Sequence, residues 1–144
     1  MPAENIYTKT EQRKEIKMIY TSYYSNRELM FAPAQLRLVG ISNSVPKWFA
    51  GEVFKELAPS WEMIHMEDKK EYERLYRSQV LAKLYPCEVM RTLDNSILLC
   101  WERPGPFCHR HIVAEWLEKA TGKPVQEFRS KYSPEQDAQL TFDF

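Results

Sequence analysis

A short, continuous apolar run in the second half of the chain most constrains the fold. Residues 97–101 read ILLCW, after the turn residues Asp94-Asn95-Ser96 and before a Pro-rich loop at 102–107. A run of this length between turn signals is typical of a strand buried on both faces. Such strands occur in parallel sheets, because helices or loops cover both sides of those sheets. We therefore predict an interior strand of a parallel sheet here.

Strand and helix patterns alternate along the rest of the chain. The other predicted strands are rich in β-branched, aromatic and aliphatic residues; they are residues 17–24, 35–42 and 125–128. The predicted helices repeat apolar side chains at three- and four-residue steps or begin at proline; they are residues 68–84, a short helix opened by Pro86, and residues 108–120. This order predicts one compact, three-layer α/β domain over residues 1–128, with 129–144 as a polar linker and tail.

Composition narrows the class of protein. The 20 Lys and Arg residues balance the 20 Asp and Glu residues, so no overall positive field attracts nucleic acid, although a local basic patch remains compatible. No apolar run approaches the roughly 20 residues of a membrane span, and residues 1–16 lack the apolar stretch of a secretory signal. We expect a soluble, cytoplasmic domain with no membrane partner.

The expected cytoplasmic location also predicts the redox state of the cysteines. Cys87, Cys100 and Cys108 are an odd number in a chain with no export signal, so reduced thiols are expected rather than a disulfide framework.

The tripeptide Cys108-His109-Arg110 stands where the last predicted helix begins, and it is the strongest candidate for chemistry. Ligands of open α/β sheets bind beyond the carboxyl ends of the strands, and a helix N-terminus attracts anions. Arg110 would fix the anion through a bidentate contact. The positive end of the helix dipole would also favour a Cys108 thiolate. His109 would carry a proton. Cys100 ends the buried strand, so the two sulfur atoms are expected to converge.

Four interpretations of this block stay open. The first is an anion-binding loop without covalent chemistry, and the second is a nucleophilic or redox-active Cys108. A zinc site of Cys100, Cys108 and a histidine lacks the short CxxC spacing and a second ligand pair, so we assign no metal ligand, and the cofactor stays unknown. In the fourth, both thiols are small buried apolar side chains and Arg110 faces solvent.

The same residues resemble a known family. Cys100 at a strand end, a Pro-rich loop and Cys108-His109-Arg110 before IVAEWL are similar to the family called "domain of unknown function 488". The segments VPKWF and LAPSW, which begin at positions 45 and 57, resemble a subgroup of it. The resemblance runs from about position 20 to 117. It implies a Rossmann-like α/β fold with a mostly parallel sheet, polar residues at one sheet edge, and nucleotide or nucleic-acid chemistry.

A second polar group follows the second predicted strand, where relatives often carry an arginine. Ser42, Asn43 and Ser44 are expected at the same sheet edge, where they would donate hydrogen bonds to a phosphate or a base edge. Trp48 would stack on a base, and Tyr23 would border the pocket. The alternative for Trp48 is a hydrophobic lid over the core.

The tail, residues 139–144 (QLTFDF), looks like the short peptide by which replication and repair proteins dock into a bacterial sliding clamp. Gln139 would hydrogen-bond the rim of an apolar groove, while Leu140, Phe142 and Phe144 fill it. The alternative is that these three side chains pack back on the parent domain.

Together these patterns predict a small α/β domain that binds a nucleotide, a nucleic-acid base or another anionic ligand at residues 108–110, in DNA metabolism. Enzyme and pure binding domain are both compatible with them. Two further classes stay open, a non-catalytic interaction protein recruited through its tail and a thiol redox protein.

Overall fold

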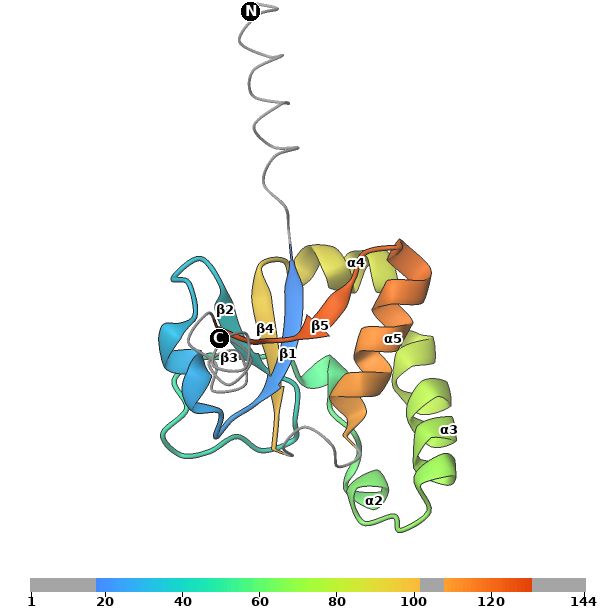
Figure 1. Cartoon of the computed structure of the whole chain (residues 1–144). Helices are drawn as coiled ribbons and strands as arrows, with labels where there is room; N and C mark the ends of the chain where they lie inside the picture. Colours follow the sequence, from blue (N-terminus) through green and yellow to red (C-terminus); the bar gives the residue numbers. More distant parts are fainter. Residues whose placement is uncertain (1–17, 102–107, 131–144) are drawn as a thin grey trace, which may run out of the picture.

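The structure is a computed structural model that describes residues 18–101 and 108–130 of the chain (Figure 1). The strands are β1 (Ile19–Tyr23), β2 (Arg37–Gly40), β3 (Glu52–Val53), β4 (Ser96–Cys100) and β5 (Val125–Glu127). The α-helices are α2 (Trp61–Ile64), α3 (Lys69–Gln79), α4 (Pro86–Thr92) and α5 (His109–Thr121). Three short 3-10 helices are η1 (Arg27–Phe31), η2 (Lys55–Leu57) and η3 (Leu81–Lys83).

The five strands form one parallel sheet in the order β3-β2-β4-β1-β5. β4 lies at its centre, where Leu98 is opposite Thr21 of β1 and Val39 of β2. All five residues of β4 are buried. The interior strand predicted from the apolar run is therefore confirmed, as is the parallel α/β fold.

The two faces of the sheet are covered differently. Alternate residues of β4 point to opposite sides, so Leu98 joins a core with α3, α4 and α5, while Ile97 and Leu99 join a second core. The second core is closed by η1 and by the loop that carries Val45 and Phe49. The predicted third layer is thus built from a 3-10 helix and loops rather than from α-helices, as Figure 1 shows to the left of β2 and β4.

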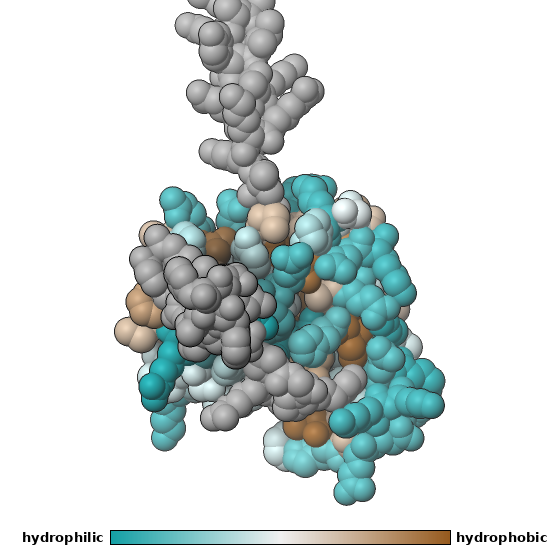
Figure 2. All heavy atoms as spheres, viewed as in Figure 1, coloured by the Kyte–Doolittle hydropathy of each residue, from teal (hydrophilic) through white to brown (hydrophobic). Residues whose placement is uncertain are grey.

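Local signals explain where the helices begin. The Asp68 carboxylate accepts hydrogen bonds from the N–H groups of Lys70 and Glu71 and so caps α3. Pro86 occupies the first turn of α4, where its missing N–H costs nothing. Figure 2 shows a mostly hydrophilic surface over the outer sides of α3 and α5, as expected for helices with one buried face.

The helix predicted over residues 68–84 is shorter in the structure. α3 ends at Gln79, and the 3-10 turn η3 follows it. The residue before a proline is restricted to extended conformations, and Tyr85, before Pro86, has φ −103° and ψ 116°. The chain must leave the helix before that point, and a 3-10 turn is the usual way to tighten a helix end.

No helix within the described ranges, 18–101 and 108–130, is long and apolar enough to cross a membrane.

Gly122 ends α5 in the left-handed conformation, with φ 72° and an N–H bonded to the carbonyl of Glu118. A Cβ at this position would meet no atom within 4 Å. Substituting Gly122→Ala should therefore destabilise the fold by about 1 kcal/mol through backbone conformation alone. Gly122→Asn should cost less, because Asn tolerates this conformation. Urea unfolding of the three chains measures both effects, and equal stability of all three would contradict the account.

Candidate functional site

A pocket of about 850 Å³ opens at the carboxyl edge of the sheet, beyond β2 and β4. Its walls come from the loop after β2, from α2, and from the first turns of α3 and α5. Six residues that the sequence predicted for the site line it: Ser42, Asn43, Ser44, Cys100, Cys108 and His109. Residues 42–44 and the residues around Cys108 therefore lie at the same sheet edge, as expected.

Two of the three cysteines depart from the expectation of reduced thiols. Cys100 and Cys108 form a disulfide, while Cys87 is exposed and free. Counting cysteines could not reveal this pair, because its proximity comes from the fold. Cys100 is the last residue of β4 and Cys108 is the N-cap of α5, and both line the pocket at the carboxyl edge of the sheet. The predicted convergence of the two sulfur atoms is confirmed.

His109 is held in a single orientation inside the protein. Its Nε2 lies 2.7 Å from the carbonyl oxygen of Ile41, so Nε2 carries the proton and donates it to that oxygen. Its Nδ1 then has a lone pair, and it lies 3.8 Å from Cys108 Sγ. Burial is the main cause that lowers the pKa of His109 to about 4. The imidazole at the pocket floor is therefore neutral at pH 7.

Arg110 lies behind the sulfur pair, outside the set of residues that line the pocket. Its side chain is 0% exposed, which corrects the alternative of a solvent-facing arginine. Nε donates to Glu127 Oε1 at 2.7 Å, and Nη1 donates to Cys100 Sγ at 2.8 Å. Its guanidinium carbon lies 5.9 Å from the centre of the Tyr23 ring. Arg110 and Tyr23 thus sit together at one side of Cys100, and the guanidinium acts on that sulfur.

The polar loop after β2 uses several of its predicted donors internally. The Ser42 hydroxyl is 2.5 Å from the Tyr24 hydroxyl and also donates to the carbonyl of Ser44 at 2.7 Å. The Asn43 amide donates to the carbonyl of Pro59. These bonds hold the shape of the pocket wall.

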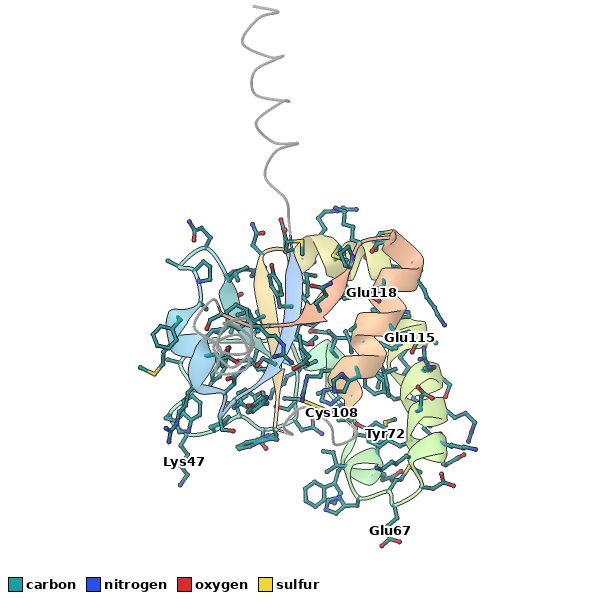
Figure 3. The ribbon with its side chains drawn as sticks, viewed as in Figure 1. Lys47, Glu67, Tyr72, Cys108, Glu115 and Glu118 are labelled. Carbon is teal, nitrogen blue, oxygen red and sulfur yellow. A yellow bond between two sulfur atoms is a disulfide. The ribbon has the colours of Figure 1, made fainter. Side chains whose placement is uncertain are left out.

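The sequence reasoning missed the outer wall of the pocket. α2 and the start of α3 supply Trp61, Lys69 and Tyr72. Trp101, which follows β4, also lines the pocket and donates to the Ser44 carbonyl. Figure 3 shows Tyr72 beside Cys108, with Glu67 farther out on the turn before α3. The charged segment that contains Lys69 gave only the pattern of a solvated helix face. The LAPSW segment, whose Trp61 is in this wall, was the available signal.

Trp48 lies elsewhere. It is 67% exposed and borders a separate pocket of about 390 Å³ with Phe49, Tyr24 and Leu99. Because Leu99 belongs to the second core, Trp48 lies on the face of the sheet away from α3, α4 and α5. The structure does not bring it to the pocket of Cys108.

The residues predicted to dock into a sliding clamp, Gln139, Leu140, Phe142 and Phe144, lie outside the described residues. That assignment stays a prediction.

Comparison with known protein families finds one family model that matches most of the chain. The family model described as "Active DUF488-N3 subclade" matches residues 6–121 of the chain. No curated protein and no solved structure shows a significant match to this chain.

The buried imidazole predicts a pH-dependent stability. Between pH 7.5 and 5.0 a histidine takes up a proton in the unfolded chain, with pKa 6.5, whereas His109 stays neutral in the folded chain, with pKa about 4. The unfolded state therefore binds more protons, and stability falls as the pH falls. For the oxidised chain we expect His109 to account for a loss of about 2 kcal/mol over this interval.

Urea unfolding of wild type and His109→Gln at both pH values isolates this contribution. The difference in stability between the two chains should shrink by about 2 kcal/mol at pH 5.0. A difference that stays constant would contradict the neutral, buried imidazole.

Proposed function

Because this chain belongs to the DUF488 family and matches its active DUF488-N3 subclade, we propose that the pocket binds a nucleotide, a nucleic-acid base or another anionic ligand, on which Cys108 acts. The observation that carries the proposal is the placement of Cys108 and His109 in the floor of an 850 Å³ pocket at the carboxyl edge of a parallel sheet. Ligands of open α/β sheets bind at that edge. The description of the subclade as active supports a chemical role.

The wall of the pocket suits a ligand with a planar ring and a negative charge. Trp61 and Trp101 are 71% and 49% exposed, and both line the pocket. Trp61 packs against the His65 ring and Trp101 against the Tyr24 ring, so a base would stack on the ring surface that these contacts leave uncovered. Lys69 brings a cationic ammonium group to the same wall. The first turn of α5 adds the positive end of a 13-residue helix, and Cys108 makes no side-chain cap there.

Cys108 is the group best placed to react when the disulfide is reduced. As N-cap of α5 it lies in the field that favours a thiolate. His109 faces its sulfur through Nδ1, but an imidazole with a pKa of about 4 is a weak base. Its role is therefore to orient the thiol by accepting a hydrogen bond, rather than to store the proton.

Ligand binding is tested through the tryptophans of the wall. Titration of the oxidised chain with AMP, ATP, a short single-stranded oligonucleotide and inorganic phosphate should quench tryptophan fluorescence for at least one nucleotide probe. Lys69→Ala should weaken that binding about tenfold, since it removes a charge-assisted contact. Lys123→Ala is the matched control, because Lys123 follows the opposite end of α5. Equal affinity of all three chains would remove Lys69 from the site, and absence of quenching by every probe would contradict the proposal.

The disulfide favours a second candidate function, that of a thiol redox protein. Reduction by an external dithiol would give two thiols, of which Cys108 lines the pocket at a helix N-terminus and Cys100 is held by Arg110. A pair of this kind can exchange disulfides with a partner through the more accessible thiolate.

This candidate predicts a ranking of thiol reactivity. After reduction, Cys108 should react with iodoacetamide at pH 7 faster than the exposed Cys87, because the field of α5 favours its thiolate. Mass spectrometry of timed peptide digests gives both rates. A slower Cys108 would argue against a redox role.

A further inference from the structure

We propose that the reduced chain binds a zinc ion between Cys100 Sγ, Cys108 Sγ and His109 Nδ1, with a fourth coordination position open to the pocket. The ligand atoms of these three residues all lie within 4.8 Å of one another, and all three residues are buried. Two thiolates and an imidazole are a ligand set that zinc adopts, and a three-residue site with an open position is typical of zinc that takes part in a reaction.

The orientation of His109 is that of a metal ligand. A histidine that binds a metal usually donates its other ring N–H to a carbonyl or a carboxylate, which fixes the tautomer. Here Nε2 donates to the carbonyl of Ile41 at 2.7 Å, so Nδ1 presents its lone pair towards Cys108 Sγ, 3.8 Å away. That bond turns the lone pair towards the sulfur pair, where an ion would receive it.

The backbone spacing of the cysteines also leaves room for an ion. Their Cα atoms are 7.5 Å apart, whereas disulfides usually span about 4.4–6.8 Å. Two thiolates on one tetrahedral zinc lie about 3.8 Å apart, because each Zn–S bond is about 2.3 Å long. A Cα separation above the usual disulfide range is compatible with sulfur atoms that move about 3.8 Å apart once the disulfide is reduced.

The surrounding charges balance a divalent cation. Arg110 and Glu127 form an ion pair of zero net charge. Two thiolates would add two negative charges, which a divalent ion neutralises. Arg110 Nη1 donates to Cys100 Sγ at 2.8 Å, so it also orients one ligand from outside the first coordination sphere. Sulfur and nitrogen donors select zinc over magnesium or calcium, which prefer oxygen.

The zinc site and the disulfide are alternative states of the same atoms. A dithiol or phosphine reductant supplies two electrons, and two protons from solvent complete the two thiols. Zinc then displaces both protons when it binds. The inference does not depend on the identity of the pocket's ligand, since it rests on the sulfur and imidazole atoms alone.

The test uses the full chain, reduced with a phosphine and then freed of reductant under anaerobic conditions. Titration with Co²⁺ should produce sulfur-to-metal charge-transfer absorption and the strong visible bands of tetrahedral cobalt, saturating at one ion per chain. Zn²⁺ should abolish these bands. Native mass spectrometry should then show one zinc on the reduced chain and none on the oxidised chain.

Substitutions assign the ligands. Cys108→Ser should lower the zinc affinity more than about a hundredfold, a larger effect than the loss of an outer-shell partner. His109→Gln is a second variant, because its amide can still donate to Ile41 while the Nδ1 ligand is lost. Cys87→Ser is the matched control and should bind one zinc with unchanged affinity, since Cys87 is exposed and outside the cluster.

Circular dichroism confirms that each variant is folded. A reduced, folded wild type without the cobalt bands, or a Cys108→Ser and a His109→Gln chain that bind as tightly as wild type, would overturn the zinc site. Nucleotide binding by the oxidised chain is measured separately, so the two proposals fail independently.

Discussion

β4 is hydrogen-bonded to β1 on one edge and to β2 on the other, and this double pairing positions the end of the site that carries Cys100. A strand held on both edges and buried over all five residues has little freedom to shift. Its last residue, Cys100, is therefore a fixed point at the sheet edge. α5 packs on β1 and β4, so Cys108 and His109 are brought to that point by the same core that stabilises the sheet.

An ion pair between the buried Arg110 and the partly exposed Glu127 connects this point to the edge of the sheet. Glu127 belongs to β5 and accepts hydrogen bonds from Arg110 and from the Thr21 hydroxyl, both at 2.7 Å. Arg110 in turn donates to Cys100. Removing Glu127 would leave the charge of the buried Arg110 without this carboxylate, which is destabilising because a buried charge needs a counter-charge. The short final strand is thus needed for the site, although none of its residues lines the pocket.

The sequence predicted most of the fold because its strongest signals are local. The run at 97–101, the cap at Asp68 and the glycine after α5 each act within a few residues of the element they define. The site was harder to predict. The partner of Arg110 is Glu127, seventeen residues later, and no local pattern links them. The side of the sheet on which Trp48 lies, and the way α2 closes the pocket, are likewise decided by packing between distant segments.

Ile41 and Ser42, which follow β2, form hydrogen bonds to side chains in the layers on both sides of the sheet. The carbonyl of Ile41 holds the imidazole of His109 on the helical side, and the hydroxyl of Ser42 holds Tyr24 on the other. Two neighbouring residues, 41 and 42, therefore contact side chains from both faces of the sheet. The Tyr24–Ser42 contact needs both hydroxyl groups, whereas His109 needs only the main-chain carbonyl of residue 41, so residues 24 and 42 should covary during evolutionary divergence while His109 does not follow them.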